Sequence, residues 1–209
     1  MNSFVVVTAD VIDSRRHPDF AALLQPKLQS FKTAAMLTPF SLSRGDEIQA
    51  LIQNGNELPI IVRHLRYRCF PLKVRIGIGI GAIESEIFSD NSWDMNGEAF
   101  FRARHAVQQL KQSKNPGTII HTENKSFDLP LNTIWMLIDY IMERWTPEQW
   151  EAIHLYEKHS TFQKAAEVLN IARQNVQKRC QAAAWDKIKT AETNLAVLMK
   201  SQFYDNSDE

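Results

Sequence analysis

Hydrophobic positions in the first part of the chain fall into short β-branched runs separated by longer amphipathic stretches. The run SFVVVTADVID predicts a buried strand, and KVRIGIGIGAI and GTIIHTE predict two more. Residues 39–43 and 47–53 predict a hairpin that turns at Gly45-Asp46. Helical spacing of apolar residues covers residues 19–36, 56–70 and 97–112. The predicted order is close to the β-α-β-β-α-β ferredoxin-like pattern, with one further unit.

Glycines alternate with isoleucines in the run VRIGIGIG. Gly77, Gly79 and Gly81 leave one face of this predicted strand without side chains. Such a face suits the close approach of another element or of a ligand.

The pattern changes after the segment KSFDLPLN, beyond which only helical periodicity is found. We therefore predict an α+β protein with two domains, a sheet domain over residues 1–126 and an all-α domain over residues 127–209. Thr146, Pro147 and Gln149 form a strong helix start in the second of these.

Composition narrows the classes of function only slightly. The 209 residues are 44% hydrophobic and carry no net charge, so a nucleic-acid partner requires a local basic face. Two distant cysteines, Cys69 and Cys180, are expected to be reduced thiols. No apolar run has the length of a membrane span and no signal peptide is evident, so we expect a cytoplasmic protein without a membrane partner.

Two carboxylates that are distant in sequence are expected to meet in such a sheet. Asp10 ends the first strand and Asp46 lies at the hairpin tip, and a split βαβ arrangement places these two positions side by side. Hard divalent ions such as Mg²⁺ or Mn²⁺ prefer oxygen ligands of this kind and keep positions open for phosphate oxygens. The alternative for Asp46 is ordinary turn chemistry, because Gly-Asp turns are common.

Four segments resemble class III nucleotidyl cyclases. They are VTADVIDSR, RGDEIQALI, VRIGIGIG and DMNGEAFFRAR, in that order along the chain. Together with the downstream helices, the chain resembles the SatD family, in which a cyclase-like N-terminal region precedes a helix-turn-helix. The resemblance implies that Asp10, Asp46 and the backbone carbonyl of Val11 bind the metal. It also implies that Asp94 recognises a purine.

The sequence departs from the cyclase pattern at three positions. Leu42 replaces a base-recognising lysine, Phe101 replaces a ribose-orienting asparagine, and His105 replaces the arginine that stabilises the transition state. Because charge stabilisation at phosphate is a large part of such catalysis, nucleotide binding without cyclisation is the simpler expectation.

Arginines supply the candidate phosphate contacts. Arg44 lies beside the hairpin carboxylates, where its alternative role is a surface salt bridge to Asp46 or Glu47. Arg102 and Arg104 follow on the helix, and side chains two residues apart diverge.

A second constellation lies in the all-α region. Ala165 and Ala166 allow close helix approach, Asn170 suits a sharp turn, and Val176 points inward on the next helix. This spacing predicts a helix-turn-helix, and it resembles the sigma-factor region 4 type. Candidate DNA contacts follow the turn: Arg173, Gln174, Asn175, Gln177, Lys178 and Arg179. The alternative is a helical bundle with a solvated polar face that packs on the sheet domain.

These observations lead to one expected function and two alternatives. The first is a nucleotide-responsive regulator that binds a purine nucleotide and double-stranded DNA as a homodimer. The second is a metal-dependent enzyme that acts on a nucleoside triphosphate. The third is an interaction module in which neither site works. The sequence leaves open whether any turnover occurs.

Overall fold

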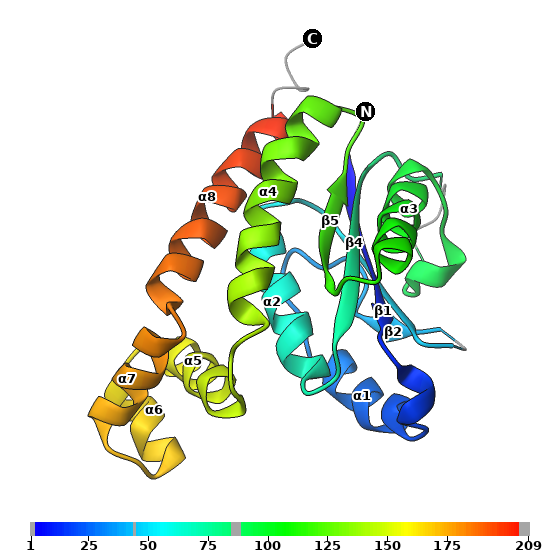
Figure 1. The fold of residues 1–209 in the computed structure, drawn as a ribbon. Helices are drawn as coiled ribbons and strands as arrows, with labels where there is room; N and C mark the ends of the chain where they lie inside the picture. Colours follow the sequence, from blue (N-terminus) through cyan, green and yellow to red (C-terminus); the bar gives the residue numbers. More distant parts are fainter. Residues whose placement is uncertain (1–2, 44, 85–88, 205–209) are drawn as a thin grey trace. The chain divides into compact units, whose positions relative to one another are not determined.

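The chain forms two compact units. The structure is a computed structural model that describes residues 3–43, 45–84 and 89–204. One unit comprises Met1–Met136 with Leu195–Glu209, and the other comprises Leu137–Asn194. Each unit is described by itself below (Figure 1).

A five-stranded mixed sheet forms the centre of the first unit. Its strands are β1 (Phe4–Val11), β2 (Ser41–Leu42), β3 (Glu47–Ile52), β4 (Val74–Gly81) and β5 (Gly117–His121). Their order is β2-β3-β1-β4-β5, in which β4 and β5 are parallel and the other neighbours are antiparallel. The predicted strands are therefore present, and the α+β class is confirmed.

Helices flank this sheet. They are α1 (Phe20–Gln29), α2 (Leu58–Cys69) and α3 (Glu98–Ser113), with short 3₁₀ turns η1 (Ser14–Arg16) and η2 (Ser92–Asp94). Figure 1 shows α3 on one side of the sheet and α2 on the other.

Two predicted helix boundaries differ from the structure. The first helix ends at Gln29, not near Met36, because the following backbone bonds to β3 instead: the N–H groups of Leu37 and Thr38 both donate to the Leu51 carbonyl. The second helix begins after Glu57, and Asn56 is not its cap.

The glycine face of β4 is covered by a helix. A Cβ atom added at Gly77 would lie 2.2 Å from the Ala103 carbonyl oxygen, and one added at Gly79 would lie 2.0 Å from that of Ala99. Both carbonyls belong to α3, so the backbone of this helix contacts the strand where side chains are missing. Helix α3, and not a ligand, therefore covers the face of β4 that the glycines leave without side chains.

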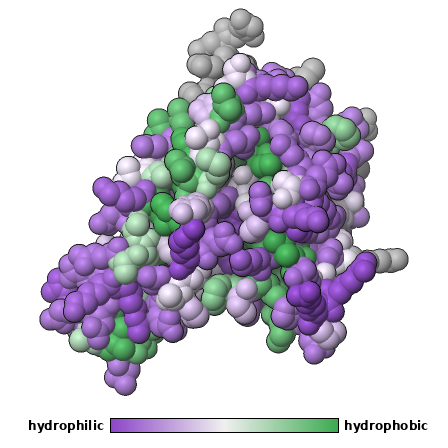
Figure 2. Space-filling model, viewed as in Figure 1, coloured by the Kyte–Doolittle hydropathy of each residue, from purple (hydrophilic) through white to green (hydrophobic). Residues whose placement is uncertain are grey.

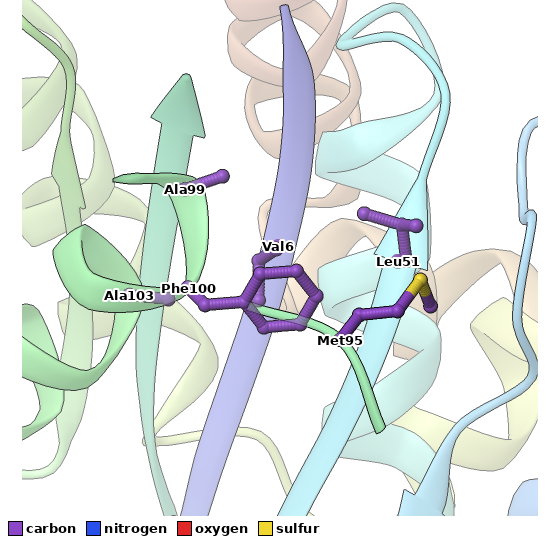
Figure 3. Packing of buried hydrophobic residues seen from close by; sticks show 6 residues of the cluster. All are labelled: Val6, Leu51, Met95, Ala99, Phe100 and Ala103. Atoms are coloured by element: carbon purple, nitrogen blue, oxygen red, sulfur yellow. The ribbon is translucent and has the colours of Figure 1, made fainter. Parts of the chain in front are cut away.

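A hydrophobic cluster fills the remaining space under α3. Its residues are Val6, Leu51, Met95, Ala99, Phe100 and Ala103 (Figure 3). The opposite face of the sheet is also apolar, since Ile76 and Ile78 alternate with the glycines and are fully buried. Both faces of β4 are thus packed, which explains why its sequence is apolar from Ile76 onward.

The second unit is helical. Its complete helices are α5 (Pro147–His159), α6 (Phe162–Leu169) and α7 (Arg173–Ala182), and it also contains parts of α4 (Lys125–Met142) and α8 (Trp185–Tyr204). The predicted capping box is present at the start of α5, where Thr146 and Gln149 each bond to the backbone of the other. No helix in the described ranges is long and apolar enough to cross a membrane.

The division between units falls later than the predicted domain boundary at residues 126 and 127. That boundary lies in the first turn of α4, whereas the contacts divide the chain after Met136. The start of α4 is held by the sheet: the Asn132 side chain bonds to both backbone groups of Ile120 in β5, and Asp128 accepts from the Thr122 N–H. These bonds tie the first half of the helix to the first unit.

The close contact between α3 and β4 leads to a stability prediction. We expect Gly79→Ala to lower the free energy of unfolding by about 3 kcal/mol, because the added methyl group meets backbone that cannot move aside. Urea denaturation followed by circular dichroism measures this change.

Gly45→Ala is the matched control. The nearest atom to a Cβ at Gly45 is 3.9 Å away, so we expect a change within about 0.5 kcal/mol. Equal effects of the two substitutions would contradict the importance of the helix–strand contact.

Candidate functional site

Charged residues of three neighbouring strands form a row at one end of the sheet. In the strand register Asp10 of β1 is opposite Glu47 of β3 and also opposite Arg75 of β4. Alternation along β1 places Asp10 on the same face as Thr8 and Val6, which is the face that α3 covers. The row therefore lies under the end of α3.

Asp10 is buried and both of its carboxylate oxygens are paired with cations. It is 4% exposed; Arg75 Nη1 lies 2.9 Å from Oδ2, and Lys111 Nζ lies 2.8 Å from Oδ1. Lys111 also reaches Glu47 Oε1 at 3.3 Å. Two carboxylates and two cations thus form one closed cluster without net charge, which satisfies the need of a buried charge for a partner.

Lys111 is the member of this cluster that comes from α3. Burial by itself lowers its pKa, but the hydrogen bond to Asp10 and the charges of Asp10 and Glu47 outweigh that effect and raise the pKa above its ordinary value. The charged amine is therefore the form that the folded protein favours.

Asp46 lies next to this cluster by backbone but has a different side-chain partner. The Val11 N–H donates to the Asp46 carbonyl at 3.1 Å, so the strand end and the hairpin tip are adjacent as predicted. The Asp46 carboxylate accepts the Ser14 hydroxyl at 2.5 Å. The two aspartates predicted to bind metal are therefore adjacent through the backbone. Their carboxylates, however, contact different groups.

This arrangement does not fit a preformed divalent-cation site. Asp10 has no oxygen without a cationic partner, and among the described residues no three His, Cys, Asp or Glu side chains could hold a metal ion. Binding of Mg²⁺ or Mn²⁺ by Asp10, Val11 and Asp46 remains a prediction from the sequence.

A cavity of about 370 Å³ opens beside the charged cluster. Its lining residues include Thr8, Glu47, Phe101, Arg104, His105 and Lys111. Thr8 is 1% exposed, and its hydroxyl has no hydrogen-bond partner in the part of the chain that the structure describes. Buried hydroxyl groups are normally satisfied, so the Thr8 hydroxyl is an exception beside this cavity.

The predicted nucleotide-binding residues are only partly brought together. Arg104 lines this cavity, and its guanidinium donates to Asn96 at 3.3 Å. Arg102 donates to the Ile80 carbonyl of β4 and pairs with Glu98 at 2.9 Å. Both arginines also line a more open hollow of about 550 Å³.

Two other predicted residues lie away from the charged cluster or outside the described residues. Asp94, in η2, is exposed and accepts the Ser89 hydroxyl at 3.1 Å. Arg44 falls outside the described residues.

Lys111 and Thr8 are the site residues that sequence reasoning missed. The signal for Lys111 is helical spacing: Ala99, Ala103, Val107 and Lys111 recur every fourth residue, on the side of α3 that faces the glycines. Thr8 is two residues before Asp10 on the strand, so alternation places both on one face.

In the second unit, α6 and α7 are joined by a sharp turn. Asn170 ends α6 in the left-handed conformation with φ of 52°, and α7 begins after Ala172. Ala166 of α6 and Val176 of α7 are buried between the helices. This is the placement of small, turn and apolar residues that the sequence predicted.

The outer face of α7 is polar and basic. Arg173, Gln174, Asn175 and Lys178 are exposed, whereas Gln177 and Arg179 are half-buried. The helix sequence contains three cations and no carboxylate. Figure 2 shows largely hydrophilic side chains over α6 and α7.

Comparisons with known proteins point to one family. Residues 4–197 match the SatD family (SatD). No curated protein matches the sequence. Among solved structures, the chain is similar to a regulator of polyketide synthase expression from Bifidobacterium adolescentis, with 10% identity over 99% of this chain and 83% of that one. The TM-score is 0.27, so the likeness supports no conclusion about fold or function.

The charged cluster leads to a second stability prediction. We expect Lys111→Met to lower the free energy of unfolding at neutral pH by about 2 kcal/mol, because Asp10 then keeps only Arg75 and Glu47 loses its contact with Lys111. Lys32→Met, at an exposed position, is the control and should change little.

The pH dependence of this difference tests its electrostatic origin. Because folding raises the pKa of Lys111, its contribution is complete below the ordinary lysine value of 10.5 and is lost as pH rises through the higher folded value. The stability gap between wild type and Lys111→Met should therefore narrow in strongly alkaline solution. A gap that is constant with pH would show lost packing, not lost charge.

Proposed function

Since the chain belongs to the SatD family, we propose that it is a DNA-binding regulator. In this proposal its second unit carries a helix-turn-helix, and its first unit is a nucleotidyl cyclase-like sensor of a purine nucleotide. The basic outer face of α7 above the buried Val176 is the observation that carries the proposal.

The arrangement of α5, α6 and α7 supports the helix-turn-helix. A short turn, a left-handed Asn170 and a buried apolar residue on the second helix are the features that set the angle between such helices. Trp145 stabilises the group from one end, because its indole N–H donates to the Ala183 carbonyl at 2.8 Å and its ring packs edge-on against Trp150.

The order of side chains along α7 suits recognition of double-stranded DNA. Residues at the start of a recognition helix reach base edges in the major groove, and Arg173, Gln174 and Asn175 are side chains that pair with guanine and adenine. Lys178 and Arg179 follow one turn later, where they can contact phosphates. The chain has no net charge, so this local face supplies the electrostatic attraction. A homodimer that reads two half-sites completes the proposal.

The cavity beside Asp10 supports the nucleotide half of the proposal. It offers cationic side chains at Lys111 and Arg104, a hydroxyl without a partner at Thr8, and an aromatic ring at Phe101 that is 68% exposed. Cations and hydroxyls bind phosphate oxygens, and an exposed ring can stack on a base. The element order β1-α1-β2-β3-α2-β4 agrees with a cyclase-like domain.

This form of binding does not require a divalent ion. Arg75 and Lys111 already neutralise Asp10 and Glu47, so Arg104, which lines the cavity, is the cation that would meet the phosphate charge. The magnesium site that the cyclase resemblance implies is therefore proposed separately and needs its own test.

DNA binding is tested with a duplex selected from a random library, followed by fluorescence anisotropy at several salt concentrations. We expect Arg173→Ala to weaken binding to the selected duplex by about 1–3 kcal/mol, with relaxed sequence preference. Lys178→Ala should weaken binding to all duplexes alike and lower the salt slope by about one.

Lys158→Ala, on the exposed surface of α5, is the matched control and should change neither quantity. Equal losses at Lys158 and Lys178 would show diffuse attraction to charge, and no binding at low salt would overturn the DNA-binding proposal.

Nucleotide binding is tested by thermal unfolding of the full chain with ATP or GTP, in EDTA and in Mg²⁺ or Mn²⁺. A ligand at about a hundred times its dissociation constant stabilises a protein by about 2.7 kcal/mol, so we expect a shift of several degrees even in EDTA. Thr8→Val, which removes only an unpartnered hydroxyl, and Arg104→Ala should both reduce it.

Arg15→Ala, at an exposed position outside this cavity, is the control. A shift that requires the ion and disappears in Asp10→Asn/Asp46→Asn would instead support the metal site. Product analysis on the same samples shows whether the nucleotide is turned over.

A further inference from the structure

A second cavity of the first unit is mainly apolar. It has a volume of about 360 Å³ and lies among η1, α1, the end of α2 and the turn that follows α2. Its apolar lining residues include Phe20, Leu23, Leu24, Phe70, Pro71 and Leu72. Leu23 is 69% exposed although it borders the cavity, so ligand contact there would cover apolar surface that now faces water.

Two cations at this cavity have no carboxylate partner. Lys27 and Arg68 both line it, and within residues 3–43, 45–84 and 89–204 neither forms an ion pair. Arg68 is held in place, because its Nε donates to the Lys27 carbonyl at 3.0 Å and its guanidinium lies 4.3 Å above the Phe31 ring. Elsewhere in this unit, by contrast, Asp10 pairs with both Arg75 and Lys111.

The other charged groups at the cavity do not cancel these two cations. Arg16 also lines it and pairs with Asp13 at 3.5 Å, which leaves Asp19 as the carboxylate among the lining residues. Cys69 lines the floor, and its burial raises the pKa of the thiol to about 12 against the opposing charges of Arg66, Lys27 and Arg68. The thiol is therefore neutral at physiological pH, and the cavity has an apolar body with excess positive charge.

We propose that this cavity binds a small amphipathic monoanion, namely a medium-chain aliphatic carboxylate. The aliphatic chain of the ligand would contact the apolar lining residues. Its carboxylate would supply the ion-pair partner that Lys27 and Arg68 lack among the described residues. A volume of about 360 Å³ is near the lower end for ligand pockets, which favours a short chain over a long lipid.

This site is separate from the cavity beside Asp10. Its helices α1 and α2 pack together, whereas the Asp10 cavity is lined from α3 on the other side of the sheet (Figure 1). Binding here therefore requires neither DNA nor a nucleotide, and its test is independent of the proposed function.

Isothermal titration of the full chain with octanoate, 1-octanol and octylamine tests the proposal. We expect octanoate to bind about tenfold more tightly than 1-octanol, because a charge-assisted hydrogen bond is added, and octylamine to bind most weakly. From butanoate to octanoate, each methylene group should tighten binding about fourfold until the cavity is filled.

Matched variants locate the site. Lys27→Met keeps the aliphatic stem and breaks no ion pair, so it should fold normally and lose about tenfold in octanoate affinity while 1-octanol binding is unchanged. Lys32→Met, outside the cavity, is its control. Leu23→Ala should weaken both ligands severalfold, whereas Leu129→Ala, at a similarly exposed 71% on α4, should weaken neither.

Three results would overturn the proposal. They are equal affinities for octanoate and 1-octanol, octanoate binding that is insensitive to Lys27→Met, and binding of an acidic peptide with an apolar anchor where octanoate does not bind. The last of these would assign the cavity to a protein partner.

Discussion

The first unit depends on a contact between the backbone of a helix and the backbone of a strand. Gly77 and Gly79 remove the side chains that would hold α3 away from β4, and Ala99 and Ala103 do the same from the helix side. A helix that lies this close brings its last turn down to the sheet. Lys111 can then reach Asp10 in β1, the strand next to β4, and Glu47 in β3, the strand beyond it. The charged cluster is in this sense a product of the glycines.

The cluster changes how the acidic motif of the first strand is understood. An aspartate at this position in a cyclase-like sequence suggests a metal ion, because two nearby carboxylates repel unless a cation lies between them. Here Arg75 and Lys111 provide that cation from within the chain. Replacing a whole buried set of this kind by apolar residues often costs little stability, so the presence of the cluster is by itself weak evidence for a role in stability.

Much of the fold follows from local sequence signals, and most of what does not follow depends on distant contacts. The β-branched runs, the hairpin and the capping box at Thr146 appear where periodicity and side-chain chemistry place them. The end of α1 was missed because the backbone after it bonds to Leu51, which local spacing does not reveal.

The same distinction applies to the sites. Asp10 and Asp46 were expected to be neighbours and are adjacent through the Val11 N–H, but the cations that surround Asp10 come from residues 65 and 101 positions later (75 − 10 and 111 − 10). On α7 Val176 is buried and Arg173, Gln174, Asn175 and Lys178 are exposed, as the helix period predicts, whereas Gln177 and Arg179, which were expected to face outward, are half-buried.

The edge of the sheet formed by β2 and β3 bears on aggregation at high protein concentration. Unpaired edge strands act as templates for pairing with other chains. β2 contains only Ser41 and Leu42, and the rest of β3 is covered by a non-strand segment: Thr38 bonds to Leu51 through both its N–H and its hydroxyl, and the Gln53 N–H donates to Ala35. Little backbone on this side is left to recruit another chain, so the central sheet is protected there from growing into an aggregate.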